Sequence, residues 1–119
     1  MKRILVVEDQ EDNRQILRDL LAAHYEVAEA ENGEEALAAV AKERPDLILM
    51  DIQMPIMDGY EATRRIKADA ATCSIPIMVV TSYALSGDEE KARTAGCNAY
   101  VTKPFSPRQL LAKIREFLP

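Results

Sequence analysis

Several features that define whole classes of protein are missing from this sequence of 119 residues. No stretch approaches the roughly 20 consecutive apolar residues that a membrane-spanning helix requires. The apolar run near the start covers only Ile4 to Val7, which is too short for a secretory signal peptide. Cys73 and Cys97 lack the spacing of a metal-binding pair, and without an export signal they are expected to stay reduced. The net charge of −5 argues against a nucleic-acid-binding surface.

These absences predict a soluble, cytoplasmic protein that binds neither membranes nor nucleic acids. The composition itself is ordinary for a globular domain, with 48% apolar and 29% charged residues. The sequence contains no internal repeat, low-complexity tract or linker. We therefore expect residues 1–119 to form one domain, which is long enough to bury a substantial core.

Five short segments have the pattern of β-strands, and segments with helical periodicity separate them. The strand segments are residues 3–7, 26–30, 47–51, 76–81 and 98–102. This alternation predicts an α/β three-layer sandwich, with helices on both faces of a parallel sheet. The first, third and fourth strands are apolar throughout and should be central, whereas the second and fifth carry polar residues and should be edges. With right-handed crossovers, the predicted fold is flavodoxin-like and doubly wound, with strand order 2-1-3-4-5.

The helical segments differ in how much apolar surface they offer. The first carries a stripe of four apolar residues that is predicted to face the core: Ile16, Leu17, Leu20 and Leu21. The fourth follows a capping-box pattern that begins at Ser86, and its body offers only Ala92 and Ala95 as apolar residues. A helix with so little surface to bury is expected to shift at a small cost in free energy.

Acidic residues follow two strands that should lie side by side. Glu8 and Asp9 come directly after the first strand, and Asp51 ends the third. In such sheets, ligands bind outside the carboxyl ends of the strands, where the strand order reverses. Two unit charges about 4 Å apart repel by about 4 kcal/mol at an effective dielectric constant of about 20, so three clustered carboxylates require a cation. Carboxylate oxygens and water suit Mg²⁺, which commonly also binds a phosphate.

Each of these residues has a simpler explanation when it is taken alone. Glu8 and Asp9 could form a solvated acidic loop, and Asp51 could cap the loop that follows it. Thr81 ends the fourth strand and Lys103 follows the fifth, which places both at the same sheet edge. An aspartate nucleophile, a divalent cation, a lysine and a hydroxyl are together the groups that formation of an aspartyl phosphate requires.

The residues resemble those of a known family, the response-regulator receiver domains of two-component signalling, and in particular chemotaxis-regulator-like members. The resemblance covers the whole chain. It is carried by Glu8-Asp9, Asp51, Met54-Pro55, Asp58-Gly59, Thr81 and the run from Tyr100 to Phe105. One departure is Ser82, where the family more often has alanine, and it adds a second hydroxyl next to Thr81.

The resemblance implies a phosphoacceptor and a metal site. Asp51 would receive a phosphoryl group from the phosphohistidine of a histidine kinase or phosphotransfer protein. The implied cofactor is Mg²⁺, bound by Asp9, Asp51 and the backbone carbonyl of Gln53. Glu8 would assist through water. The chain would thus be a signalling switch, and it would be no enzyme beyond assisting its own phosphotransfer and autodephosphorylation.

The resemblance also implies how the signal is read. Lys103 and Thr81 would contact the phosphoryl group, and Thr81 would act with Tyr100 as the switch. The Lys103–Pro104 peptide bond would be cis, which costs little before proline. Because the fourth helix has almost no large apolar anchor, the surface predicted to change comprises the fourth helix, the fifth strand and the fifth helix. Its implied partners are a downstream protein effector and a second copy of the chain in a phosphorylation-dependent homodimer.

The phosphorylated state is predicted to be long-lived. Hydrolysis needs a water molecule in line with phosphorus, and the positions two residues beyond Asp51 and Thr81 flank its path in this fold. These positions are Gln53 and Tyr83. Gln53 cannot act as a carboxylate base, and Tyr83 is bulky enough to cover the opening.

Three alternatives remain at this point. A haloacid-dehalogenase-type phosphatase would also use an aspartate nucleophile, but its second acid is replaced by Gln53 here. A flavodoxin-type flavin carrier would need a phosphate-binding loop after the first strand, where acids would repel phosphate. The chain could also be a receiver module of a hybrid histidine kinase or a multidomain regulator. The initial Met1 and the complete final helix favour a stand-alone regulator.

Overall fold

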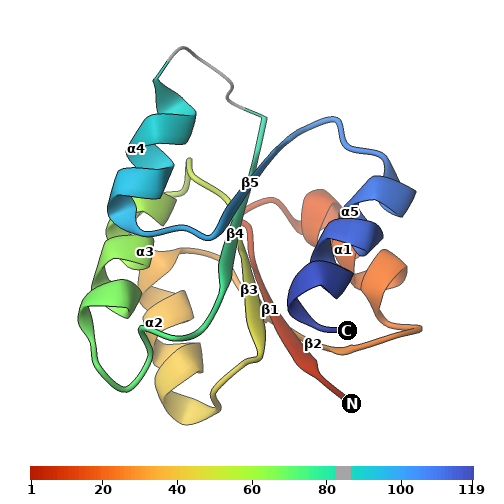
Figure 1. Ribbon diagram of the computed structural model, residues 1–119, viewed down its shortest axis with the longest axis horizontal. Coiled ribbons are helices and arrows are strands. Elements are labelled where there is room, and N and C mark those ends of the chain that lie inside the picture. The colour runs from red at the N-terminus through yellow and green to blue at the C-terminus, as the bar shows by residue number, and fades with distance from the viewer. Residues whose placement is uncertain (83–86) are drawn as a thin grey trace.

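The computed structural model describes residues 1–82 and 87–119, and these form one parallel sheet covered by helices (Figure 1). The strands are β1 (Arg3–Val7), β2 (Glu26–Ala30), β3 (Leu47–Met50), β4 (Ile77–Thr81) and β5 (Ala99–Thr102). The helices are α1 (Glu11–Leu21), α2 (Gly33–Lys42), α3 (Gly59–Ala68), α4 (Asp88–Ala95) and α5 (Pro107–Phe117). The strand order is β2-β1-β3-β4-β5, which confirms the predicted topology. Among the described residues, no helix has both the length and the apolar character needed to cross a membrane.

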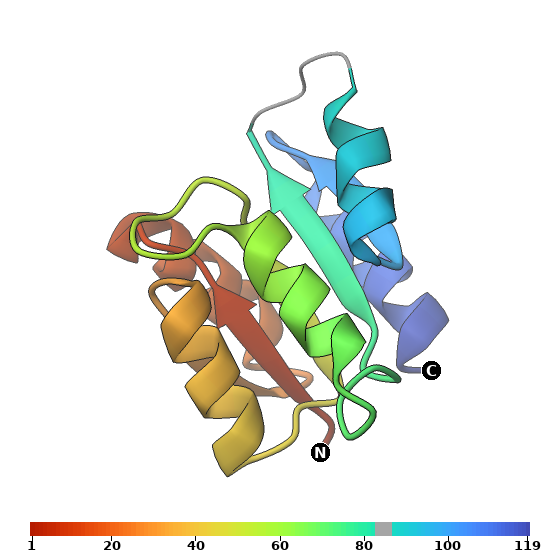
Figure 2. The ribbon, with the colours of Figure 1, turned by 90° about the vertical axis from the view of Figure 1, so that its left-hand side faces the viewer.

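The helices form two layers, with α2, α3 and α4 on one face of the sheet and α1 and α5 on the other (Figures 1 and 2). Alternate residues of each strand point to opposite faces, so each strand contributes to two cores. In β1, Leu5 and Val7 join the core under α2 and α3, whereas Ile4 and Val6 join the core under α1 and α5. The central strands are therefore apolar throughout because both of their faces are buried.

The burial of the strands confirms which of them are edges. Every residue of β3 and β4 is buried, whereas β2 and β5 each keep exposed or half-buried positions. Replacing a large apolar residue of a central strand by alanine is expected to cost about 2–5 kcal/mol of stability. The sheet thus holds the carboxyl ends of β1 and β3 rigidly side by side.

Three helices begin with a side-chain cap close to that carboxyl edge. Asn32, Asp58 and Ser106 each accept a hydrogen bond from the backbone amide three residues later, which satisfies an otherwise unpaired donor. Because a cap fixes where a helix starts, it also fixes the loop that precedes it. The caps of α2, α3 and α5 therefore define the loops around the site described below.

The prediction that Ile16 faces the core is wrong. Its side chain is 58% exposed, whereas Leu17 and Leu21 are buried and Leu20 is half-buried. Successive residues of a helix are turned by about 100°, so a stripe centred on Leu17 and Leu21 directs Ile16 to solvent. The remaining buried position on this helix is Arg14, a charged residue.

The helix α4 is held by little apolar surface, as predicted. Its buried residues are Ala92 and Ala95, and it is bounded by two glycines with positive φ, Gly87 at 92° and Gly96 at 113°. The predicted capping box at Ser86 lies outside the described residues. A tyrosine on α3, Tyr60, adds a polar contact, because the Lys91 Nζ atom lies 4.5 Å from the centre of its ring.

Candidate functional site

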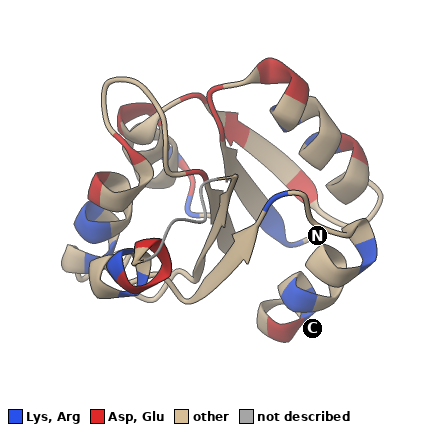
Figure 3. Cartoon of the chain, turned by 90° about the horizontal axis from the view of Figure 1, so that it is seen from above, with Lys and Arg blue, Asp and Glu red and all other residues tan. Residues whose placement is uncertain are grey.

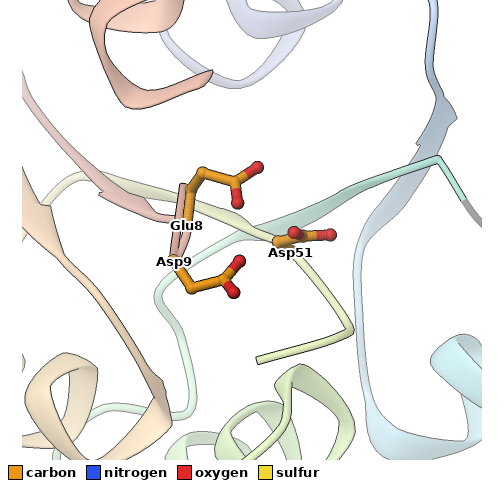
Figure 4. A group of neighbouring side chains, drawn as sticks. All are labelled: Glu8, Asp9 and Asp51. Carbon is orange, nitrogen blue, oxygen red and sulfur yellow. The ribbon is translucent and has the colours of Figure 1, made fainter. Parts of the chain in front are cut away.

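Three carboxylates meet at the carboxyl ends of β1 and β3. The two strands pair so that Val7 lies opposite Met50, and the Asp51 amide donates to the Val7 carbonyl at 3.0 Å. This register brings Asp51 beside the residues that follow β1. One oxygen from each of Glu8, Asp9 and Asp51 lies within 4.8 Å of the other two, as Figure 4 illustrates. The structure thus brings together the three acids that the sequence analysis singled out.

The electrostatics of this cluster fit a bound cation. Burial raises the pKa of Asp51 to about 7, and the negative charge of Glu8 adds to the rise against the opposing effect of Lys103. The pKa of Asp9 is also raised, by burial and then by Glu8. A bound cation would favour the ionised forms of both carboxyl groups, and their oxygens are the ligands that Mg²⁺ prefers. Asp9 also lines a groove of about 560 Å³ together with Gln53, which leaves room for water ligands.

Both carboxylate oxygens of the third acid, Glu8, accept a hydrogen bond. Its side chain is only 2% exposed, and one oxygen accepts a hydrogen bond from Lys103 Nζ at 2.6 Å while the other accepts one from the Gln10 amide at 3.1 Å. Burial acts to raise the pKa of Glu8, but the bonds from Lys103 and Gln10, the positive charge of Lys103 and a hydrogen bond with Asp9 together lower it. Glu8 therefore stays ionised as the partner of Lys103. This direct pairing was missed by the sequence analysis.

Two further strand ends supply a hydroxyl and a cation. Thr81 is buried at the end of β4, and the Lys103 amide donates to its carbonyl oxygen at 2.7 Å. Both residues thus lie at the same sheet edge as Asp51. The neighbouring Ser82 is exposed, so of the two adjacent hydroxyl residues it is Thr81 that is enclosed by the fold.

The residues assigned to switching and hydrolysis occupy different surroundings. Tyr100 is half-buried on β5, where burial, and then Asp88 of α4, raises its pKa. Gln53 is exposed at the groove beside Asp9. Tyr83 lies outside the described residues. The cis peptide bond at Lys103–Pro104 is confirmed.

A close approach between α3 and the site was also missed. A Cβ atom on Gly59 would lie 2.0 Å from the Asp51 carbonyl oxygen, so only glycine fits at the start of this helix. The Gly59 amide donates to Ile52 at 2.9 Å, which ties the helix to the loop after Asp51. In the pair Asp58-Gly59, Asp58 therefore caps the helix, and the absence of a side chain at Gly59 leaves room for the Asp51 carbonyl oxygen.

Seen from above, toward the carboxyl ends of the strands, acidic and basic residues are interspersed over the helices on both sides of the sheet (Figure 3).

The fold and the acidic edge together define a flavodoxin-like α/β domain of the chemotaxis-regulator type. The family model described as "Response regulator receiver domain" matches residues 4–115. The chain therefore belongs to the response regulator receiver family of two-component signalling. This membership argues against the flavin-carrier and phosphatase alternatives.

Named relatives agree with this assignment. The chain is 44% identical over 118 residues to the "Polar-differentiation response regulator DivK" of Brucella anthropi, covering 98% of this chain and 96% of the relative. It is 36% identical to the receiver domain of the sensor histidine kinase PA1611 from Pseudomonas aeruginosa, with a TM-score of 0.91 and coverage of 98% and 97%. That structure has a magnesium ion coordinated in its active-site cleft. The chemotaxis protein CheY4 of Vibrio cholerae is 31% identical, with a TM-score of 0.91 and coverage of 98% of both chains.

Proposed function

We propose that residues 1–119 form a single receiver domain that acts as a phosphorylation-activated switch. Asp51 accepts a phosphoryl group from the phosphohistidine of a histidine kinase or phosphotransfer protein, and the surface of α4, β5 and α5 then changes to regulate a protein partner. The observation that carries this proposal is the convergence of Asp51 with Glu8 and Asp9 within 4.8 Å, at the edge where Lys103 also lies.

The proposed transfer is a substitution at phosphorus. An Asp51 carboxylate oxygen forms the new bond to phosphorus, and the bond from phosphorus to the histidine nitrogen breaks. The imidazole keeps the electron pair and takes up a proton. Lys103 offsets charge on the phosphoryl oxygens, and Thr81 donates a hydrogen bond to one of them. Glu8 holds the Lys103 ammonium at this edge, as the 2.6 Å ion pair supports.

Asp9, Asp51 and the backbone carbonyl of Gln53 would hold Mg²⁺. When bound, Mg²⁺ neutralises charge on phosphoryl oxygens and positions them. A nearby cation also favours the ionised form of a carboxyl group. Asp51, whose pKa is raised to about 7 by burial and by Glu8, would thereby be ionised and able to act as the nucleophile at neutral pH.

The phosphoacceptor is tested by intact-mass measurement with a small phosphodonor and Mg²⁺. The wild type is expected to gain one phosphoryl group, and Asp51→Asn is expected to gain none. Asp58→Asn is the matched control, because Asp58 lies in the same groove and its cap can be made by asparagine. EDTA and Asp9→Ala should each suppress labelling. Stoichiometric labelling of Asp51→Asn would place the phosphoacceptor elsewhere.

The lifetime of the phosphorylated state is tested at Tyr83. Tyr83→Ala is expected to speed autodephosphorylation, because the proposal assigns the shielding of the attacking water's path to a bulky residue at this position. The measurement is the decay of phosphorylated protein after the phosphodonor is removed. An unchanged or slower decay would contradict the shielding role.

A further inference from the structure

A buried arginine on α1, Arg14, contacts the backbone of the loop that carries Glu8 and Asp9. The Arg14 side chain is only 9% exposed, and its Nη1 atom donates to the Glu8 carbonyl oxygen at 2.7 Å. Its Nε atom donates to Glu29 on β2 at 3.2 Å, and its Nη2 atom donates to Glu11 within α1. One rigid guanidinium group therefore joins the β1–α1 loop, the first helix and an edge strand.

The contact with the Glu8 carbonyl bears directly on Asp9. That carbonyl belongs to the peptide unit between Glu8 and Asp9, and a peptide unit is planar. Fixing its oxygen therefore fixes the direction in which the chain enters Asp9. The other groups of Glu8 are held separately, because its amide donates to Ala30 at 3.0 Å and its carboxylate is bonded to Lys103. Arg14 is the side chain that holds this peptide carbonyl.

We propose that Arg14 is a positioning residue, which orients the Glu8–Asp9 peptide so that the Asp9 carboxylate is preorganised for Mg²⁺. The inference rests on the proposed function, in which Asp9 is a metal ligand. Groups that orient a metal ligand from behind typically change metal affinity 10- to 100-fold when they are removed. The fork of an arginine suits this task because it can donate to several acceptors at fixed angles.

A neighbouring arginine provides a matched control. Arg18 donates to the same Glu29 at 2.8 Å, and its other terminal nitrogen lies 3.5 Å from Glu11. It is 36% exposed, and its hydrogen bonds go to these two glutamates rather than to the Glu8 carbonyl. Arg14→Met and Arg18→Met each remove one positive charge that is bonded to Glu11 and Glu29. Because a positive charge repels Mg²⁺, the loss of charge alone would strengthen Mg²⁺ binding in both variants. Positioning predicts the opposite sign for Arg14→Met only.

The experiment measures Mg²⁺ affinity from amide NMR shifts of the folded protein, with the free energy of unfolding measured in parallel. Arg14→Met is expected to raise the Mg²⁺ dissociation constant about tenfold or more, whereas Arg18→Met should leave it unchanged or lower it. Arg14→Lys keeps the charge but loses the fork, so it should also weaken binding. This second variant decides the matter if Arg14→Met does not fold.

The outcomes are distinguishable. A folded Arg14 variant that binds Mg²⁺ as tightly as the wild type would overturn the positioning role, and so would equal weakening by Arg18→Met. A loss of stability without a change in Mg²⁺ affinity would assign Arg14 a purely structural role and overturn the proposal. If the wild type itself showed no saturable Mg²⁺ binding, the proposed function would fail first, and this inference with it.

Discussion

Asp51 is placed where its ionised form is unfavourable and yet where its proposed chemistry needs that form. The carboxylate is half-buried and lies near those of Glu8 and Asp9, so its pKa is raised from an ordinary 3.8 to about 7. A protonated carboxyl group is a poor nucleophile. The site is therefore expected to depend on a cation in two ways, first to ionise Asp51 and then to bind the phosphoryl oxygens.

The raised pKa of Asp51 predicts how stability depends on pH without metal. Between an ordinary pKa of 3.8 and a folded-state pKa of about 7, the folded protein binds more protons than the unfolded chain. The contribution of Asp51 to the free energy of unfolding therefore falls as pH rises through this window and levels off above it. Urea unfolding in EDTA across this range should show the fall in the wild type, and Asp51→Asn should lack it.

Asp58→Asn serves as the control for this titration, since it changes a carboxylate in the adjacent groove that caps a helix. The control should keep the wild-type fall in this window. Parallel curves for the wild type and Asp51→Asn would show that Asp51 does not titrate near neutral pH in the folded state.

Single residues show what the sequence could predict about the site. Asp51 and Thr81 could be found because each ends an apolar run, and strand ends share one sheet edge. Arg14 could not be found, because a charged residue on an amphipathic helix is normally solvated, and its burial depends on Glu29 of a separate strand. The prediction for Ile16 failed because the buried stripe of α1 is centred on Leu17 and Leu21, and it extends to Leu20 rather than to Ile16.

Among the elements, α4 is the one with the weakest attachment. Only Ala92 and Ala95 are buried among its residues, so its burial contributes little apolar stabilisation. The contact of Lys91 with the Tyr60 ring adds a cation–π interaction worth about 0.5–1 kcal/mol at an exposed site. A segment held so weakly can be displaced by a small differential free energy. The sequence predicted this property, because the absence of large apolar residues is visible without the structure.

The weak attachment of α4 predicts where a phosphate mimic acts at a distance. Beryllofluoride on Asp51 is expected to draw the Thr81 hydroxyl inward and to favour inward rotation of Tyr100. Amide NMR shifts should then change most, away from the site, between Ser82 and Phe105. Thr81→Ala should shrink these remote changes, because it removes the hydroxyl that is proposed to link phosphate to β4 and α4.

Both conformers should be detectable without the mimic, since a ligand shifts an equilibrium only by its differential affinity for two states. The loops around Glu8 and Asp51 provide the internal reference, because they should respond in the wild type and in Thr81→Ala alike. A remote response that survives the loss of Thr81, or one confined to those loops, would rule out this coupling.

At the scale of the whole molecule, the fold was predictable because its signals agree with one another. Apolar strands alternate with helices, and the polarity of Glu26–Ala30 and Ala99–Thr102 marks them as edges. The pairing of Glu8 with Lys103 was not predictable. It joins the ends of β1 and β5, which are not neighbours in the sheet, and depends on how two long side chains extend across the intervening strands.

The metal site predicts a change in the stability of the whole domain. A ligand that binds only the folded state at 100 times its dissociation constant stabilises it by about 2.7 kcal/mol, which corresponds to a rise of roughly 10 °C in thermal midpoint. Saturating Mg²⁺ should therefore raise the midpoint of the wild type above its value in KCl of equal ionic strength. Asp9→Asn should lose most of this shift, whereas Asp58→Asn should retain it. An equal shift in all three proteins would mean that Mg²⁺ acts elsewhere.

The ion pair between Glu8 and Lys103 also bears on when the site forms during folding. Its two residues are 95 positions apart, and the Nζ and Oε1 atoms that join them are 2.6 Å apart. Closing a loop of that length costs about 4 kcal/mol of chain entropy, which local contacts do not repay. The pair is therefore expected to form late in folding, after the sheet has brought both ends of the chain to one edge. A nascent or partly folded chain is expected to expose Asp51 without the Lys103 ammonium nearby, so we expect the proposed phosphotransfer to require the completed fold.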